Sequence, residues 1–315
     1  MREEKNVAFG DDVTISGTLT IPESRDKHLP AILIVSGSGP TDRDGNAPQL
    51  KGNIYKELAD FLESIGFVTL RYDKRGVGES EGDFATAGMS DLVTDAVSAV
   101  AFLREHSRVD PNRIVVLGHS EGGLLASAIN MGTEINGIVM LAGGAGETLL
   151  EATDYQREIA YDQLESLSGL KGFLIRKLKI VNKDKKKAKR LFEKMRTTTK
   201  DTIRYNFVKL NAKWWREHMQ FQLPEALNQM TCPLLAVTGS KDVQSNPKAL
   251  DKLEQYVSTD VETHVIENMN HMLKIQHEDI EIQRLMSIYK KGINEPMAKQ
   301  LQEVLETWLT KHFRR

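Results

Sequence analysis

The chain has 315 residues but a single cysteine, Cys232, so no disulfide can form within it. A lone cysteine is typical of proteins that work in a reducing compartment, and we expect a cytoplasmic location. Cys232 precedes Pro233 at the start of an expected strand. We interpret it as a buried structural thiol rather than a reactive one.

Long apolar runs are also missing. No apolar run approaches the roughly 18 residues that span a bilayer, so we expect no membrane span. Residues 1–6 contain no apolar segment of the signal-peptide kind; the open alternative is a signal that was already removed. No histidine or cysteine spacing suggests zinc, and no glycine-rich loop ends in Gly-Lys-Ser or Gly-Lys-Thr. We therefore expect neither a metal nor a cofactor.

Net charge is small, at −2, but it is unevenly distributed. Residues 171–200 hold 13 Lys and Arg against Asp184 and Glu193, a local balance of +11. Phe173 and Phe192 are the only aromatic residues there and the whole chain is slightly acidic, so a nucleic-acid partner is not expected. We interpret the stretch as a solvated helical face. The alternative is a surface at the pocket entrance that steers anionic substrates.

Alternating strand and helix patterns dominate the rest of the chain. Residues 13–21 alternate as a half-exposed strand does, and they are expected to form a hairpin with residues 6–9. Further strands are expected at residues 31–35, 67–71, 113–117, 135–141, 233–238 and 261–266. Helices are expected at residues 54–65, 92–104, 124–131, 247–256 and 297–312. This alternation predicts an α/β protein with a mostly parallel sheet flanked by helices.

The alternation stops between residues 147 and 230, where no strand-like run is evident. Leu174, Leu178 and Val181 are expected to share one helical face. A second face is expected from Ala188, Leu191, Phe192 and Met195. We therefore predict an α/β core formed by residues 1–146 and 231–315, interrupted by an all-helical insertion whose apolar faces pack on the core or line a pocket.

The motif Gly-x-Ser-x-Gly at residues 118–122 carries the main chemical signal. The apolar, β-branched run before it indicates a strand, and the run after it indicates a helix. A serine on so sharp a turn exposes its hydroxyl, and the glycines avoid clashes at the corner. Ser120 is therefore the candidate nucleophile. His119 is assigned a supporting role because it cannot easily fold back onto its neighbour's hydroxyl.

A serine nucleophile needs a base and an orienting carboxylate. Asp242 follows the expected strand 233–238, and His271 follows the expected strand 261–266. Both therefore lie at the edge of the sheet where open α/β folds bind ligands. The alternatives are that Asp242 caps the next helix and that His271 has no catalytic role.

The developing oxyanion needs donors. The backbone N–H of Glu121 is one candidate, and the loop at residues 36–40 supplies the other, with Ser38 first and Gly39 second. The alternative is a glycine-rich turn without catalytic duty. Trp214 and Trp215, with Met219 and Phe221, are expected to line an acyl pocket or to pack the insertion on the core.

Together these motifs resemble the serine hydrolases of the α/β-hydrolase superfamily, closest to bacterial esterases and acyl-peptidase-like enzymes related to serine aminopeptidases. The resemblance covers about residues 1–146 and 231–315. It is carried by residues 36–45, 71–80, 118–123, 239–242 and 270–271. The loop opens with Ser36 where many relatives have His. The resemblance implies an α/β-hydrolase fold, with an inserted cap at residues 147–230 and a structural turn formed by Asp73 and Arg75.

The expected function is cofactor-independent hydrolysis of carboxylic esters through an acyl-enzyme on Ser120. The first alternative is a small-peptide or acyl-peptide hydrolase that uses the same three residues. The second is a ligand-binding homologue without turnover. The expected partner is a small acyl ester or a short peptide. The loop Asp42-Arg43-Asp44 is expected to form ion pairs rather than a metal site.

Overall fold

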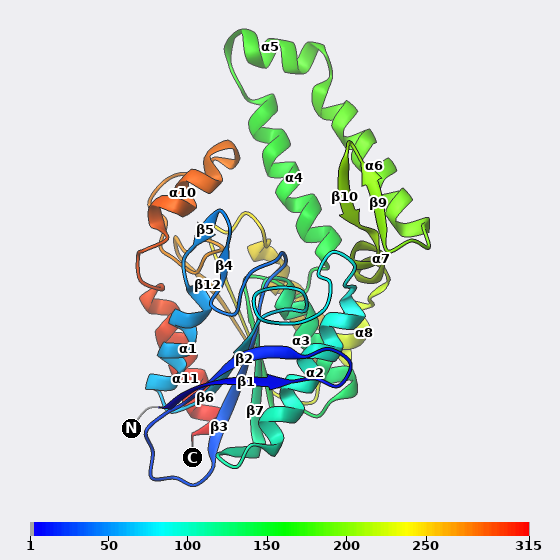
Figure 1. The fold of residues 1–315 in the computed structure, drawn as a ribbon. Helices are drawn as coiled ribbons and strands as arrows, with labels where there is room; N and C mark the ends of the chain where they lie inside the picture. The colour runs from blue at the N-terminus through cyan, green and yellow to red at the C-terminus, as the bar shows by residue number, and fades with distance from the viewer. Residues whose placement is uncertain (1–2, 315) are drawn as a thin grey trace.

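The computed structural model describes residues 3–314 and is built around one eight-stranded sheet (Figure 1). The strand order is β1-β2-β6-β3-β7-β8-β11-β12. The strands are β1 (Glu3–Phe9), β2 (Ile15–Ile21), β3 (Leu29–Val35), β6 (Val68–Tyr72), β7 (Val109–His119), β8 (Gly137–Leu141), β11 (Leu234–Gly239) and β12 (Val261–Ile266). β2 pairs antiparallel with β1 and with β6, and all other pairs are parallel. The predicted mostly parallel sheet and N-terminal hairpin are confirmed.

Helices cover both faces of the sheet, which explains why β3, β8 and β11 are buried along their whole length. One face packs against α2 (Met89–Glu105), α3 (Glu121–Gly132), α8 (Leu223–Asn228) and α9 (Leu253–Tyr256). The other packs against α1 (Ile54–Ser64) and α11 (Lys299–Phe313). Cys232 is buried in the first of these two cores, and burial raises the pKa of its thiol to about 11.

Several element boundaries differ from the sequence prediction. The single helix expected at residues 247–256 is a 3₁₀ turn, η1 (Pro247–Lys252), followed by α9. No element is predicted for residues 267–296, yet they contain η2 (Ile282–Arg284) and α10 (Leu285–Gly292). A small pair of strands, β4 (Asn46–Ala47) and β5 (Leu50–Lys51), was also not predicted.

The insertion is not entirely helical, so that prediction was wrong in part. It holds α4 (Leu149–Glu165), α5 (Gly169–Lys177), α6 (Ile180–Thr197), β9 (Thr202–Tyr205), β10 (Val208–Asn211), α7 (Ala212–Gln220) and α8. β9 and β10 form an antiparallel hairpin. Asn206 and Phe207 form its two-residue turn with φ of 46° and 66°, the left-handed conformation that such turns require.

The predicted shared face of Leu174, Leu178 and Val181 is also wrong. The chain turns at Lys179, whose φ is 53°, so α5 and α6 are separate helices. Val181 is buried, but Leu174 and Leu178 are 42% and 50% exposed. These two leucines therefore pack on neither the core nor the pocket.

A buried ion pair joins the loop at residues 42–46 to the turn after β6. Arg43 donates from Nε and Nη2 to Asp73 Oδ2, over 3.0 and 2.6 Å. The backbone N–H of Arg43 donates to Asp73 Oδ1, and that of Glu79 donates to Oδ2. Arg71 Nε donates to Asp44 Oδ1 over 2.7 Å. The expected ion pairs of this loop are confirmed, and they brace the turn that follows β6.

We predict that Asp73→Ala lowers the free energy of unfolding by about 3 kcal/mol, because it removes the buried partner of Arg43 and leaves that guanidinium only Glu79, whose side chain is 69% exposed. Urea denaturation followed by circular dichroism measures this change. The matched control is Glu158→Ala, which breaks the exposed ion pair with Lys185 and should cost no more than about 1 kcal/mol. Equal losses in the two variants would contradict a structural role for the buried pair.

Candidate active site

Ser120 occupies the turn between β7 and α3 in a conformation that few residues other than glycine adopt, with φ 56° and ψ −120°. The backbone is closely packed on both sides of this turn. A Cβ on Gly118 would lie 2.1 Å from Gly122 O, and a Cβ on Gly122 would lie 2.1 Å from Val35 O. The two glycines of the motif are therefore required by close backbone packing. Ser120 N donates to Leu141 O over 2.8 Å, which ties the turn to the neighbouring strand.

The structure brings Asp242 and His271 together at the carboxyl edge of the sheet. His271 Nδ1 lies 2.9 and 3.1 Å from the two carboxylate oxygens of Asp242. Because a carboxylate only accepts, Nδ1 carries a proton, and in the neutral imidazole the lone pair is then on Nε2. Asp242 is fully buried, and its Oδ1 also accepts from the backbone N–H groups of Gln244 and Ser245. Asp242 and His271 thus have the relation of an orienting carboxylate and a base.

His119 is buried beside this pair with both ring nitrogens occupied. Its Nε2 donates to the His271 carbonyl over 2.9 Å, because a carbonyl can only accept. Its Nδ1 then accepts from the Tyr55 hydroxyl over 3.0 Å, and that hydroxyl accepts from Gly37 N–H. Burial and then the nearby His271 lower the pKa of His119 to about 3, so the ring is neutral. Its contacts hold the backbone of His271 in place.

Ser38 and Glu121, the two candidate oxyanion donors, line the same cavity as Ser120. Among the hydrogen bonds within residues 3–314, none uses the backbone N–H of Ser38 or of Glu121. Likewise, none of those bonds joins Ser120 Oγ to His271 Nε2. Such bonds are often long before substrate binds. Two unused amides beside a serine hydroxyl are available to an incoming carbonyl oxygen.

Lys74 and the Glu121 side chain form a buried network that the sequence reading missed. Lys74 Nζ lies 3.2 Å from Glu121 Oε2 and donates to the Gly37 carbonyl. From the insertion, Trp214 Nε1 donates to Glu121 Oε1 over 2.6 Å, and His218 Nε2 lies 3.1 Å from the same oxygen. Burial raises the pKa of Glu121, but Lys74 and the two insertion residues outweigh it and lower this pKa to about 2. A fixed anion thus links the loop at residues 36–40, the turn that holds Ser120 and the insertion.

A cavity of about 280 Å³ opens above Ser120. Its walls come from α4, from the segment just before it, and from Trp214 and Trp215 on α7. The two tryptophans therefore line the pocket. Met219 instead lines a separate cavity between α4 and α6, and Phe221 packs against the core. Among the described residues, none from the basic stretch 171–200 lines the Ser120 cavity.

Glu147 is an unexpected wall residue of this cavity. It is 4% exposed, and its Oε1 accepts from Ser245 Oγ and from Asn246 N–H, over 2.6 and 3.0 Å. Within residues 3–314, no hydrogen bond reaches its Oε2 and no cationic side chain pairs with it. The pKa of Glu147 is raised to about 7, because burial, together with the nearby Asp242 charge, outweighs the two hydrogen bonds that lower it. The pocket therefore holds one carboxyl group without a counter-ion.

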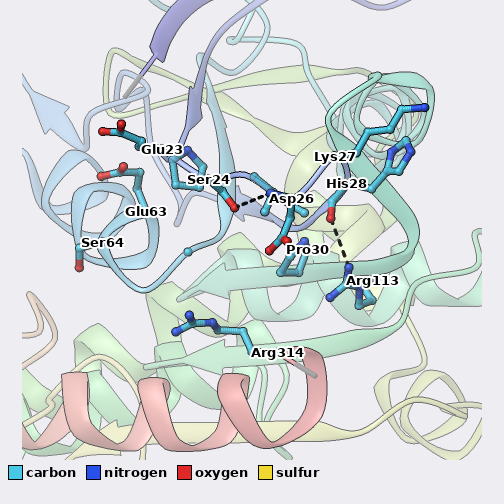
Figure 2. A pocket seen from close by; sticks show the side chains of 13 residues that line it. Glu23, Ser24, Asp26, Lys27, His28, Pro30, Glu63, Ser64, Arg113 and Arg314 are labelled. Atoms are coloured by element: carbon cyan, nitrogen blue, oxygen red, sulfur yellow. Dashed lines mark hydrogen bonds between the residues drawn. The ribbon is translucent and has the colours of Figure 1, made fainter. Parts of the chain in front are cut away.

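A larger cavity, of about 760 Å³, lies away from this chemistry, between the β2–β3 loop and the end of α11 (Figure 2). Its wall mixes exposed acidic and basic side chains, among them Glu23, Asp26, Lys27 and Arg314. Arg113 donates there to the His28 carbonyl over 3.4 Å. None of Ser120, Asp242 and His271 lines it. Size alone therefore does not identify the functional pocket.

Known proteins resemble this chain in sequence and in fold. The family described as serine aminopeptidase, S33, matches residues 51–278. Esterase EstD of Thermotoga maritima is 29% identical over 276 residues, which cover 86% of this chain and 60% of EstD. The chain thus spans about three fifths of that relative.

Among solved structures, Est1E of Butyrivibrio proteoclasticus with ferulic acid bound has a TM-score of 0.58 at 18% identity, covering 90% of this chain and 96% of Est1E. The α/β hydrolase GrgF of Penicillium sp. sh18 has a TM-score of 0.59 at 16% identity, covering both chains completely. These likenesses concern the fold alone. The family match covers well over half of the sequence, so the chain belongs to the serine aminopeptidase S33 family and has the α/β-hydrolase fold.

Proposed function

We propose that the protein hydrolyses carboxylic esters through an acyl-enzyme on Ser120. The observation that carries this proposal is the arrangement at the carboxyl edge of the sheet. The strained Ser120 lines one small cavity together with Ser38 and Glu121, whose backbone N–H groups are unused. The His271–Asp242 pair lies at the same edge, on the segments that follow β12 and β11. The relative EstD is named an esterase, which supports the same reaction class.

In this mechanism, Ser120 Oγ attacks the acyl carbonyl while His271 Nε2 takes its proton. Asp242 holds Nδ1–H and stabilises the imidazolium that forms. The carbonyl oxygen becomes an oxyanion and accepts from the N–H groups of Ser38 and Glu121. His271 then gives its proton to the leaving alcohol, and the acyl group stays on Ser120.

Water completes the cycle. His271 Nε2 takes a proton from a water molecule that attacks the acyl-enzyme, and the same two N–H groups hold the second oxyanion. Collapse of this intermediate returns the proton to Ser120 Oγ and releases the carboxylic acid. Residues 147–230 act as a cap in this proposal, because α4 and α7 limit the cavity to small acyl groups.

We predict that Ser120→Ala folds normally but loses ester hydrolysis by several orders of magnitude, because the covalent step is lost. The measurement is kcat/KM on p-nitrophenyl butyrate, with circular dichroism as the folding check. A fluorophosphonate should label the wild type and not the variant. A wild-type protein that is neither labelled nor active would instead indicate a ligand-binding homologue.

His271→Ala should be as severe as Ser120→Ala, because it removes the base. Asp242→Asn should be severe but milder, because it disturbs the tautomer and charge of His271 rather than removing it. Steady-state kinetics on the same ester measures both. The matched control is His264→Ala, a histidine on β12 that pairs with Glu262. If His264→Ala were the more damaging variant, the assignment of the base would be wrong.

Glu147 favours a second candidate function, the hydrolysis of aminoacyl esters or small peptides. An ammonium group in the pocket would find the free Oε2 of Glu147 and the faces of Trp214 and Trp215. No Lys, Arg or His side chain of residues 3–314 lines that cavity to oppose it. The serine aminopeptidase description of the family agrees with this alternative.

Two esters of equal shape distinguish the candidates: p-nitrophenyl 3-aminopropanoate and p-nitrophenyl butyrate. If the second function holds, the wild type prefers the amine, and Glu147→Gln lowers kcat/KM for the amine at least about tenfold while sparing butyrate. Glutamine keeps an oxygen for Ser245 and Asn246. Glu165→Gln, on the exposed side of α4, is the control. If the wild type and Glu147→Gln each had the same kcat/KM on both esters, the second function would be excluded and simple ester hydrolysis would remain the proposal.

A further inference from the structure

Large apolar side chains are exposed together at one place on the insertion. Ten large hydrophobic residues of the described chain are exposed, and five of them lie between residues 170 and 180. They are Leu170 (74%), Phe173 (52%), Leu174 (42%), Leu178 (50%) and Ile180 (42%). Single exposed hydrophobic residues are ordinary, but a cluster of this kind marks an interaction surface. We refer to residues 170–180 as the apolar tip.

The apolar tip lies at the end of the insertion farthest from the sheet, where α5 connects the outer ends of α4 and α6 (Figure 1). Its other side is anchored. Ile175 and Val181 are buried with Tyr161 in a small cluster between the three helices. The exposed side chains are therefore held outward by packing on the opposite face of α5.

The tip segment itself carries charge of one sign. Residues 166–183 contain five Lys and Arg and no Asp or Glu, and the nearest acidic residues in sequence are Glu165 and Asp184 at its two ends. Lys171, Lys177 and Lys179 are exposed, and within residues 3–314 none of them forms an ion pair with an acidic side chain. Lys177 Nζ lies 5.4 Å from the centre of the Phe173 ring. Apolar and cationic groups are thus mixed on the same surface, and α6 continues the positive charge.

Two occupants of this surface can be compared. A second copy of the chain, related by a two-fold axis, would bring two patches of the same positive charge together, which is unfavourable. An anionic lipid surface complements the charge and buries the apolar side chains at once. Exposure to water would explain the lysines, but it would not explain why the Leu and Phe side chains are exposed. The anionic bilayer is the occupant that satisfies both features.

We propose that the apolar tip is a membrane-interface anchor, which inserts Leu170, Phe173 and their neighbours into the surface of an anionic bilayer. Helix α5 lies in the interface and does not cross it. This agrees with the finding that no helix within residues 3–314 is long and apolar enough to span a membrane. Insertion of such a helix reaches roughly 5–10 Å, the boundary between headgroups and acyl chains. The core and the Ser120 cavity stay in water beneath the cap.

Vesicle flotation tests the anchor on the full chain. We expect the wild type to bind vesicles of phosphatidylcholine with about 30 mol% phosphatidylglycerol, and to bind pure phosphatidylcholine at least about tenfold more weakly. Rising salt should weaken binding to the anionic vesicles. The variant Leu170→Ser/Phe173→Ser/Leu178→Ser should lose at least about tenfold in binding. The variant Lys171→Gln/Lys177→Gln/Lys179→Gln should lose most of the preference for anionic vesicles.

The control is Met131→Ser/Val265→Ser, which removes two side chains of similar exposure, 46% and 47%, from the α/β core. It should bind like the wild type. Circular dichroism and hydrolysis of a soluble p-nitrophenyl ester without vesicles check that every variant folds, and they separate the anchor from the proposed catalysis.

Insertion itself is read from Leu174→Trp, whose added emission should be quenched by brominated lipid in anionic vesicles. The anchor would be overturned if the wild-type protein did not float with anionic vesicles. It would also be overturned if the variant Leu170→Ser/Phe173→Ser/Leu178→Ser floated as well as the wild type. A tryptophan that brominated lipid leaves unquenched would overturn it as well. A dimer seen by sedimentation, and lost in the serine variant without any vesicle binding, would assign the tip to a second copy instead.

Discussion

The close approach of α3 to the end of β7 is the constraint on which the site depends. The backbone at Gly118, Gly122 and Gly123 meets neighbouring carbonyl oxygens at distances that leave no room for a Cβ. This packing forces Ser120 into a positive φ and turns its side chain toward the cavity. The strain is local, and the surrounding strands β3 and β8, each buried throughout, hold it in place.

A second constraint is electrostatic. Glu121 follows the nucleophile directly, and its buried carboxylate meets Lys74, Trp214 and His218. These partners come from the turn after β6 and from α7 of the insertion. The side chain of Glu121 thus fixes the insertion above the site, while the backbone N–H of the same residue is the proposed oxyanion donor. Removing a buried carboxylate from such a network would leave Lys74 without its partner, which is costly in a low-dielectric interior.

The insertion therefore has two different ends. Near the core, Trp214, Trp215 and α4 enclose a small pocket whose one uncompensated carboxyl belongs to Glu147. At the far end, α5 presents leucines, phenylalanine and lysines to the outside. The positive charge of residues 171–200 runs from this outer end along α6, and none of these residues lines the Ser120 cavity. We propose different roles for these ends: the inner end selects the substrate, and the outer end binds the surface on which the protein works.

Local patterns in the sequence predicted much of the framework, because they report short-range preferences. Buried strands appear as continuous apolar runs, and their alternation with helices predicts a parallel sheet. Chain order places Asp242 and His271 just after strands whose carboxyl ends lie at the same edge as Ser120. The glycines of the motif at residues 118–122 predict the tight turn between β7 and α3. The hairpin β9–β10 was missed because two four-residue strands inside a helical stretch carry little periodic signal.

Contacts between distant segments were decided only by the tertiary structure. Nothing near Lys74 in the sequence indicates that it meets Glu121, 47 residues away. In the sequence, Glu147 has the pattern of an ordinary loop carboxylate. Only the fold buries it against Ser245. Leu174 and Leu178 read as core residues by their spacing, and the turn at Lys179 leaves them exposed. Sequence alone determined the strands and helices of the core and the order of the candidate catalytic residues. Burial and charge pairing depend on which segments meet, and that is a property of the folded chain.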